Sequence, residues 1–173
     1  MAFGAFHYLL TDLWKEETSP NYTEVSLVSD SKPRNRRIYV MYHGTTVAAA
    51  EQIIMNGFRQ SPDGMLGRGV YVSRDQEKAA RYPLCDQSDQ VILKLHVNVG
   101  RVKKIDQQDH PMQKTWHDEG YDTAWVPKCC GMVDSGLEED CVWDPDRIKV
   151  VWIVKAPRGH FRKLKELFIK SKK

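Results

Sequence analysis

Apolar residues in the first half of the chain follow strand-like and then helix-like spacings. The stretch "IYVMY" at 38–42 is rich in β-branched and aromatic residues, which is typical of a strand. After the tripeptide HGT, the apolar residues of 47–58 recur every three or four positions, as on one face of a helix. Thr46 can cap the start of this helix and Gly57 can end it. The pattern therefore predicts a strand and a helix that meet at HGT.

A second junction of the same kind follows. "VYVS" at 70–73 predicts a short strand that carries Tyr71. Ser73 and Gln76 have the S-x-x-Q spacing of a capping box, which predicts a helix over "RDQEKAARY" that ends at Pro83. Both HGT and Tyr71 are thus expected where a strand turns into a helix.

The second half of the chain contains more strands than helices. Residues 91–99 alternate between apolar and polar, which predicts a half-buried strand, and "TAWV" and "CVW" predict two shorter ones. The continuous apolar run at 148–154 predicts the most buried strand of the chain. Short strands with only two clear helices between them favour an α+β domain with antiparallel or mixed sheets.

Basic residues accumulate at the C-terminal end. From Lys155 onward there are eight Lys or Arg and one Glu, a formal charge of +7, so the rest of this chain of net charge +3 carries −4. Phe161, Leu164 and Phe168 share one face of a predicted helix, which we expect to dock on the domain with its basic side in solvent. The alternatives are contact with nucleic acid or an anionic surface, or self-association.

Composition and cysteine spacing fit a single soluble domain. The chain has 173 residues, of which 41% are hydrophobic and 28% charged. No apolar run reaches the roughly 18 residues of a membrane span, and the opening lacks the basic start of a signal peptide. The four cysteines have neither a disulfide framework nor the spacing of a metal site. We therefore expect a cytoplasmic protein without a metal.

Three glycines precede the second strand in "GMLGRGVYVS" at 64–73. Lys-Ser is absent after Gly69, so the stretch is not a Walker loop, and it leads into a strand where a dinucleotide fingerprint leads into a helix. A tight bend that lets the backbone approach a ligand and directs Tyr71 into a cleft fits better.

The motifs "HGT", "GRGVY" and "EDCVWDP", in this order, resemble the catalytic domain of the poly(ADP-ribose) polymerase (PARP) and diphtheria-toxin-like ADP-ribosyltransferase superfamily. Together with "KTWHDEGYDTAWVP", the chain is similar to the fish interferon-inducible, grass-carp-reovirus-induced Gig proteins, over roughly 38–154. The resemblance implies two small packed sheets with flanking helices and a role in innate antiviral defence. It places a PARP-like domain at 38–155, between an extension and linker at 1–37 and a C-terminal helix at 156–173.

The same resemblance implies NAD as substrate and a catalytic triad of His43, Tyr71 and Glu139. His43 is expected to bind the adenosine ribose, and Glu139 the 2′-hydroxyl of the nicotinamide ribose. The resemblance also implies that Glu139 would stabilise the cation that forms as nicotinamide leaves. The other residues expected to contact NAD are Gly44, Thr45, Arg59, Gly69, Lys78 and Tyr82. Gly44 would bind the carboxamide, and Tyr82 would sandwich the nicotinamide ring with Tyr71.

Two departures from the family pattern bear on activity. Ala79 occupies the position of a serine that binds the carboxamide in the family, and the segment 58–69 is shorter than in polymerising members. Mono-ADP-ribosylation of a protein or nucleic acid fits better than polymer synthesis. The alternatives are a module that binds NAD or ADP-ribose without turnover, and an interaction protein that uses its basic C-terminal helix.

Overall fold

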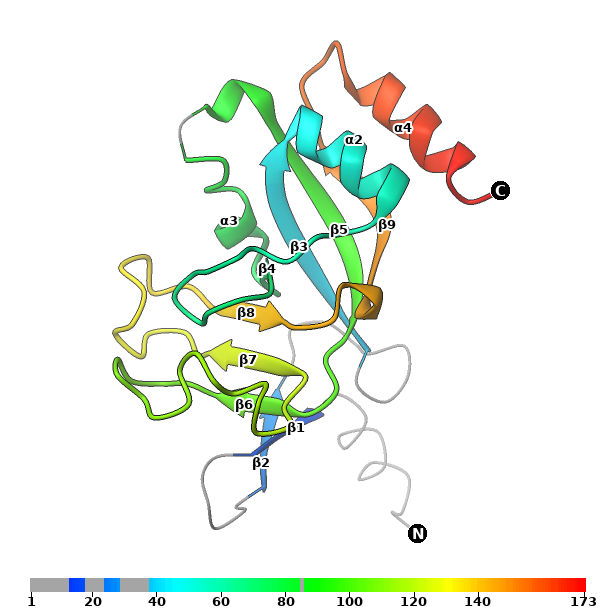
Figure 1. The fold of residues 1–173 in the computed structure, drawn as a ribbon. Coiled ribbons are helices and arrows are strands. Elements are labelled where there is room, and N and C mark those ends of the chain that lie inside the picture. Colours follow the sequence, from blue (N-terminus) through cyan, green and yellow to red (C-terminus); the bar gives the residue numbers. More distant parts are fainter. Residues whose placement is uncertain (1–12, 18–23, 29–37, 85) are drawn as a thin grey trace, which may run out of the picture.

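Two sheets and three α-helices make up the part of the chain that the structure describes. The structure is a computed structural model, and it describes residues 13–17, 24–28, 38–84 and 86–173 (Figure 1). One sheet is antiparallel and three-stranded, and the other is mixed and six-stranded. The expected α+β architecture is therefore confirmed.

The three-stranded sheet contains the longest strands. Its antiparallel order is β3 (Ile38–Thr46), β5 (Gln90–Asn98) and β9 (Ile148–Lys155). The central strand β5 is buried on both faces over Gln90–Leu93, because neighbours flank it on both edges and elements cover its faces. The predicted strand is present, but it is more buried than its alternating pattern indicates.

Strand β9 forms an edge of this sheet, so the prediction that 148–154 is the most buried strand is wrong. The Trp152 side chain is 48% exposed, and only Ile148 and Ile153 of β9 are buried. A continuous apolar run fits burial on two faces, but here helix packing covers β9 only in part.

The six-stranded sheet is assembled from short strands of distant sequence. Its order is β2 (Glu24–Val28), β1 (Leu13–Glu17), β6 (Val102–Lys104), β7 (Thr123–Val126), β8 (Glu139–Val142) and β4 (Val70–Val72). Strands β1, β6 and β7 are parallel to one another, and the other pairs are antiparallel.

Strands β1 and β2 come from the segment 1–37, which we predicted to be an extension and linker. Strand β1 pairs with β6, so this segment contributes to the sheet. The predicted linker at 29–37 lies outside the described residues. The division of the chain at 37 and 155 stays a prediction.

The helices begin where local side chains cap them. Helix α2 (Val47–Asn56) follows Thr46, whose hydroxyl accepts from the Ala49 N–H at 3.2 Å, and Gly57 ends it, as predicted. Helix α3 (Gln76–Ala79) is only one turn long.

The predicted capping box before α3 is wrong. The cap is Asp75, whose carboxylate accepts from the Glu77 N–H at 2.9 Å. The Ser73 hydroxyl instead donates to the Glu138 carbonyl at 2.8 Å and so links β4 to β8. Both Ser and Asp can cap, and the sequence alone does not say which one lies closer to the helix.

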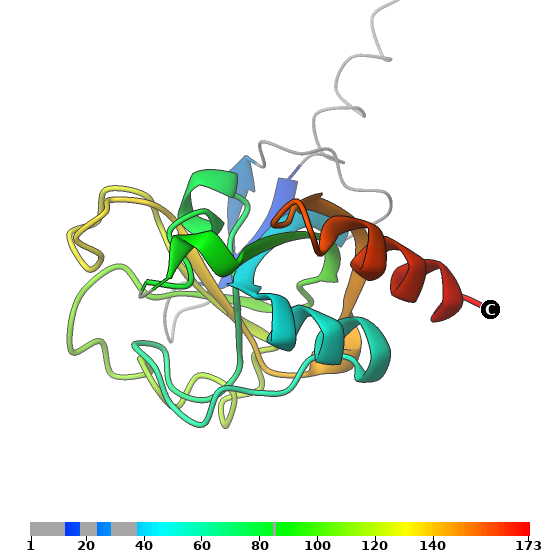
Figure 2. The ribbon, with the colours of Figure 1, turned by 90° about the horizontal axis from the view of Figure 1, so that it is seen from above.

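Helix α4 (Phe161–Lys170) packs against the domain beside α2, as Figure 2 shows from above. Leu164 is fully buried, and Phe161 and Phe168 pack against the main core. Lys163 forms an ion pair with Glu51 of α2 at 2.7 Å. The prediction of a docked C-terminal helix is confirmed. Among the helices of the described residues, none is long and apolar enough to cross a membrane.

A backbone bridge joins the two sheets. The Tyr42 N–H donates to the Ser73 carbonyl at 2.7 Å, and the Ser73 N–H donates back to the Tyr42 carbonyl at 3.1 Å. This bridge joins β3 to the end of β4, so the two predicted strand-to-helix junctions lie side by side. A pocket opens at this place.

Candidate active site

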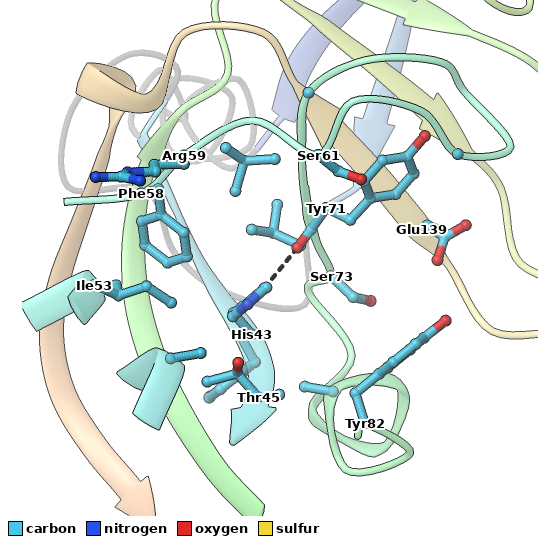
Figure 3. Close-up of a pocket in the computed structure, with 18 of the residues that line it drawn as sticks. His43, Thr45, Ile53, Phe58, Arg59, Ser61, Tyr71, Ser73, Tyr82 and Glu139 are labelled. Carbon is cyan, nitrogen blue, oxygen red and sulfur yellow. Dashed lines mark hydrogen bonds between the residues drawn. The ribbon is translucent and has the colours of Figure 1, made fainter. Parts of the chain in front are cut away.

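A pocket of about 740 Å³ lies where the two sheets meet (Figure 3). Its walls come from β3, α2 and the loop after it, the glycine loop before β4, helix α3 and strand β8. All nine residues predicted to contact NAD line it, namely His43, Gly44, Thr45, Arg59, Gly69, Tyr71, Lys78, Tyr82 and Glu139. Residues far apart in sequence are thus brought to one cavity.

His43 is held as a neutral imidazole. Its Nδ1 lies 2.8 Å from the Tyr71 carbonyl, which can only accept, so Nδ1 carries the proton. Burial lowers the pKa of His43, and the hydrogen bond to Tyr71 offsets only part of this effect. The Phe58 ring packs edge-on at 5.2 Å between centroids. The unprotonated Nε2 is therefore an acceptor, suited to a ribose hydroxyl.

Gly44 presents its backbone to the pocket. Tyr42 directs its N–H and C=O away from β5, toward Ser73. The direction of these groups alternates along a strand, so Gly44 directs its own N–H and C=O toward the same edge, away from β5. A Cβ on Gly44 would lie 1.8 Å from the Ala79 carbonyl oxygen, so only glycine fits here.

The glycine loop fixes the ring of Tyr71. The Tyr71 hydroxyl donates to the Gly67 carbonyl at 2.6 Å and accepts from the Leu66 N–H at 3.0 Å. A Cβ on Gly64 would lie 2.3 Å from this hydroxyl, and Gly69 has a φ of 155° with Cys141 against it. The pKa of Tyr71 is raised, mainly by burial. The glycines thus let the backbone enclose the Tyr71 ring and fix its hydroxyl, whereas the predicted approach of this backbone to a ligand stays a prediction.

Glu139 projects from β8 into the pocket and is paired with one cation. Its carboxylate lies 3.2 Å from the Lys78 ammonium of α3, and both side chains are largely buried. Figure 3 draws the carboxylate between the rings of Tyr71 and Tyr82. Burial and this carboxylate raise the pKa of Tyr82. The site therefore combines a fixed negative charge with two aromatic rings.

Glu138 has a different environment, although it is the next residue. Its carboxylate accepts from Arg74 Nε at 2.7 Å, from Arg74 Nη2 and from the Trp125 indole at 3.0 Å, all of them buried. Only Glu139 of this acidic run lines the pocket. Sequence reasoning missed the Arg74–Glu138 pair. The available signal is that side chains alternate between the two faces of a strand over 138–140, which puts Glu138 on the face opposite to Glu139.

Asp140 lies on the same side of β8 as Glu138. It is fully buried, and within the described part of the chain neither carboxyl oxygen has a hydrogen-bond partner. Burial, and then the neighbouring Glu138 carboxylate, raise the pKa of Asp140 well above its usual value. Its surroundings therefore favour the protonated carboxyl over the carboxylate.

Three further residues shape the site. Ala79 is buried and lines the pocket beside Gly44, so no hydroxyl stands at that position. Tyr82 is 37% exposed at the rim. Phe58 was missed by sequence reasoning, because a single aromatic residue after a helix gives no signal of a binding wall.

No cluster of three or more metal-ligating side chains occurs among the residues that the structure describes.

Comparison with known proteins assigns the family. The model of the poly(ADP-ribose) polymerase catalytic domain matches residues 9–128, a range that includes His43 and Tyr71 and ends before Glu139. The chain is 28% identical over 115 residues to the protein mono-ADP-ribosyltransferase PARP3 of Gallus gallus. That alignment covers 65% of this chain and 21% of the relative, so the chain spans about a fifth of its length. With its two sheets and flanking helices, the chain belongs to the PARP catalytic-domain family and has the α+β ADP-ribosyltransferase fold.

Proposed function

We propose that the protein is a mono-ADP-ribosyltransferase that uses NAD as its substrate. The observation that carries this proposal is the position of Glu139, which lines the same pocket as His43 and Tyr71. Three residues from three separate elements provide a hydroxyl acceptor, an aromatic surface and a carboxylate around one cavity. Their convergence supports a reaction more specific than nucleotide binding.

The cavity suits NAD in size and chemistry. Its volume of about 740 Å³ is in the range of small-molecule sites, about 300–1,000 Å³. The N–H and C=O of Gly44 would bind the carboxamide, and the nicotinamide ring would lie against Tyr71 and Tyr82. His43 Nε2 would accept a hydrogen bond from a hydroxyl of the adenosine ribose. Hydrogen bonds already fix the His43 and Tyr71 side chains, so binding need not order these two.

The proposed reaction breaks the bond between the ribose C1′ and the nicotinamide nitrogen. The electron pair of that bond leaves with nicotinamide, and positive charge develops on the ribose. The Glu139 carboxylate stabilises this charge electrostatically and accepts a hydrogen bond from the 2′-hydroxyl. A nucleophile of the acceptor, a protein or nucleic acid, then bonds to C1′ and releases its proton to solvent. Lys78 orients the Glu139 carboxylate through their ion pair.

A nicotinamide-release assay on Glu139→Gln tests the proposal. The variant keeps the shape of the side chain but removes its charge, so we expect kcat to fall about 10²–10³-fold. NAD affinity should change much less, because the charge acts mainly in the transition state. Glu119→Gln is the matched control, since Glu119 is exposed and outside the pocket. Absence of nicotinamide release by the wild type, or unchanged turnover in Glu139→Gln, contradicts the proposed activity.

A binding module for NAD or ADP-ribose is the second candidate, and Ala79 favours it. This position lines the pocket beside Gly44 and offers no hydroxyl to the carboxamide. Isothermal titration with NAD and with ADP-ribose separates the candidates. Binding of both ligands without nicotinamide release supports the module.

We further propose that the protein acts in the cytoplasm in innate antiviral defence. The support is the resemblance of its motifs to the interferon-inducible Gig proteins. In infected cells, expression of the wild type should lower virus yield, and Glu139→Gln should lower it less. Equal protection by both would separate the antiviral role from catalysis. Microscopy of the tagged protein checks the compartment.

A further inference from the structure

A second hollow lies on the other side of the loop that follows α2. Its volume is about 780 Å³, and it shares Phe58 and Arg59 with the first pocket. The Gln60 amide donates to the Trp143 carbonyl at 2.6 Å and fixes the loop between the two cavities to the end of β8. None of the proposed catalytic residues lines this hollow.

One wall of the hollow is a pair of stacked rings. His117 lies parallel to Trp143, with 3.7 Å between the centroids and 6° between the planes. The Trp116 ring packs edge-on against both. His117 Nδ1 also bonds the Tyr121 carbonyl at 3.2 Å, so the orientation of the stack is fixed. A stack of this kind can be extended by another flat aromatic ring, such as a nucleobase.

Two arginines of the hollow are available for an anion. In the described part of the chain, neither Arg59 nor Arg68 has a hydrogen bond or ion pair from its guanidinium, and both are exposed. Figure 3 shows the Arg59 side chain pointing away from Tyr71 and Glu139. Guanidinium groups suit phosphate because they donate two parallel hydrogen bonds.

The hollow has three other charged residues, and two of them neutralise each other. Arg147 forms an ion pair with Asp122 at 2.9 Å, which leaves Asp144 as the acidic group to set against Arg59 and Arg68. Asp144 caps the turn Pro145–Arg147 by accepting from the Asp146 N–H at 2.9 Å, so its carboxylate has a defined place. A carboxylate can accept from the exocyclic amine of a base.

From this arrangement we propose that the hollow binds a nucleoside phosphate, with the base near the His117–Trp143 stack and the phosphate on Arg59 and Arg68. The ligand is either a free mononucleotide or the phosphorylated end of a single strand, which share this chemistry. The hollow adjoins the first pocket through Arg59, so a strand bound here would lie next to the proposed reaction site. The proposal does not depend on transferase activity.

Fluorescence anisotropy with a 5′-phosphorylated, 3′-labelled adenylate octamer tests this site. We expect Arg68→Gln to weaken binding about fivefold to tenfold, because it removes one phosphate contact, and added salt to weaken wild-type binding. His117→Ala should weaken binding about tenfold through lost stacking, and His117→Phe should restore most of it. If AMP displaces the octamer, the site binds the terminal nucleotide. If AMP does not displace it, the site binds a longer strand.

Two controls distinguish this site from other causes of binding. Arg158→Gln removes an exposed arginine outside both cavities, and equal loss in this variant and in Arg68→Gln would overturn the proposal as general charge attraction. The proposal is also overturned if Arg68→Gln and His117→Ala both leave octamer binding unchanged. NAD titration of Arg68→Gln should give the wild-type affinity, because Arg68 does not line the first pocket. Failure of this site is thereby separable from failure of NAD binding.

Discussion

Two neighbouring glutamates at the start of β8, Glu138 in the protein interior and Glu139 in the pocket, differ in how completely their carboxylates are bonded. On the interior side, Arg74 and Trp125 supply Glu138 with hydrogen bonds to both carboxylate oxygens. On the pocket side, Glu139 has one ion pair among the described residues, with Lys78. The saturated carboxylate stabilises the junction of the sheets, and the unsaturated one keeps acceptor positions for a substrate. Neighbouring residues of one type thus have separate tasks.

The largest effect that tests this contrast is on stability. Glu138→Gln removes the charge that faces the buried Arg74 guanidinium, so we expect the free energy of unfolding to fall by about 3 kcal/mol or more. Glu139→Gln should lower it by less, because it breaks one ion pair, with Lys78, and no further hydrogen bonds. Urea denaturation followed by circular dichroism measures both. Equal losses would mean that both glutamates are structural.

A smaller effect is expected at Asp140, and it depends on pH. The folded-state pKa of this carboxyl is raised by burial and by Glu138, with Arg74 acting in the opposite direction and Glu139 adding to the rise. The folded protein therefore holds a proton that the unfolded chain releases, and wild-type stability falls as the pH rises from about 4 toward the folded-state pKa. Over that window the slope approaches about 1.4 kcal/mol per pH unit.

Asp140→Asn should remove this slope, because an amide does not ionise. We expect the variant to be more stable than the wild type at pH 7 and the difference to shrink as the pH approaches 4. Urea denaturation at several pH values measures this. A difference that stays constant with pH would show that Asp140 titrates as it does in water.

The smallest effect concerns the pocket side alone. Ala79→Ser restores a hydroxyl beside Gly44 and should tighten nicotinamide binding by up to about tenfold, since a hydrogen bond contributes roughly 0.5–1.5 kcal/mol. ADP-ribose has no carboxamide, so its affinity should not change. Calorimetry of both ligands gives the comparison and its control. A change for ADP-ribose, or none for nicotinamide, would argue against nicotinamide at this place.

Local patterns predicted what depends on local chemistry. The caps of α2 at Thr46 and Gly57 and the docked face of α4 follow from neighbouring residues, so the structure confirms them. The edge position of β9 depends on strands that are distant in sequence, and the apolar run at 148–154 does not indicate which strands will pair with it. The cap of α3 depended on which of two adequate residues lay nearer to it.

The candidate site was predictable only through its motifs. Family resemblance named His43, Tyr71 and Glu139, and the fold brings all three to one cavity. Composition and periodicity alone could not relate β8 to β3, because the bridge between Tyr42 and Ser73 that aligns the two sheets is a tertiary contact. The second hollow depends on the His117–Trp143 stack, which joins two segments without a recognisable pattern.

The edge position of strand β9 also bears on solubility. An edge strand rich in valine and isoleucine is a template on which another chain can add a strand and begin aggregation. Lysines stand at both ends of the apolar stretch, since Lys149 and Lys155 are exposed. Their charges repel a second copy of the same strand, and the Lys165 ammonium lies 5.2 Å from the centre of the exposed Trp152 ring. Exposed lysines on an edge strand thus disfavour the addition of a second strand.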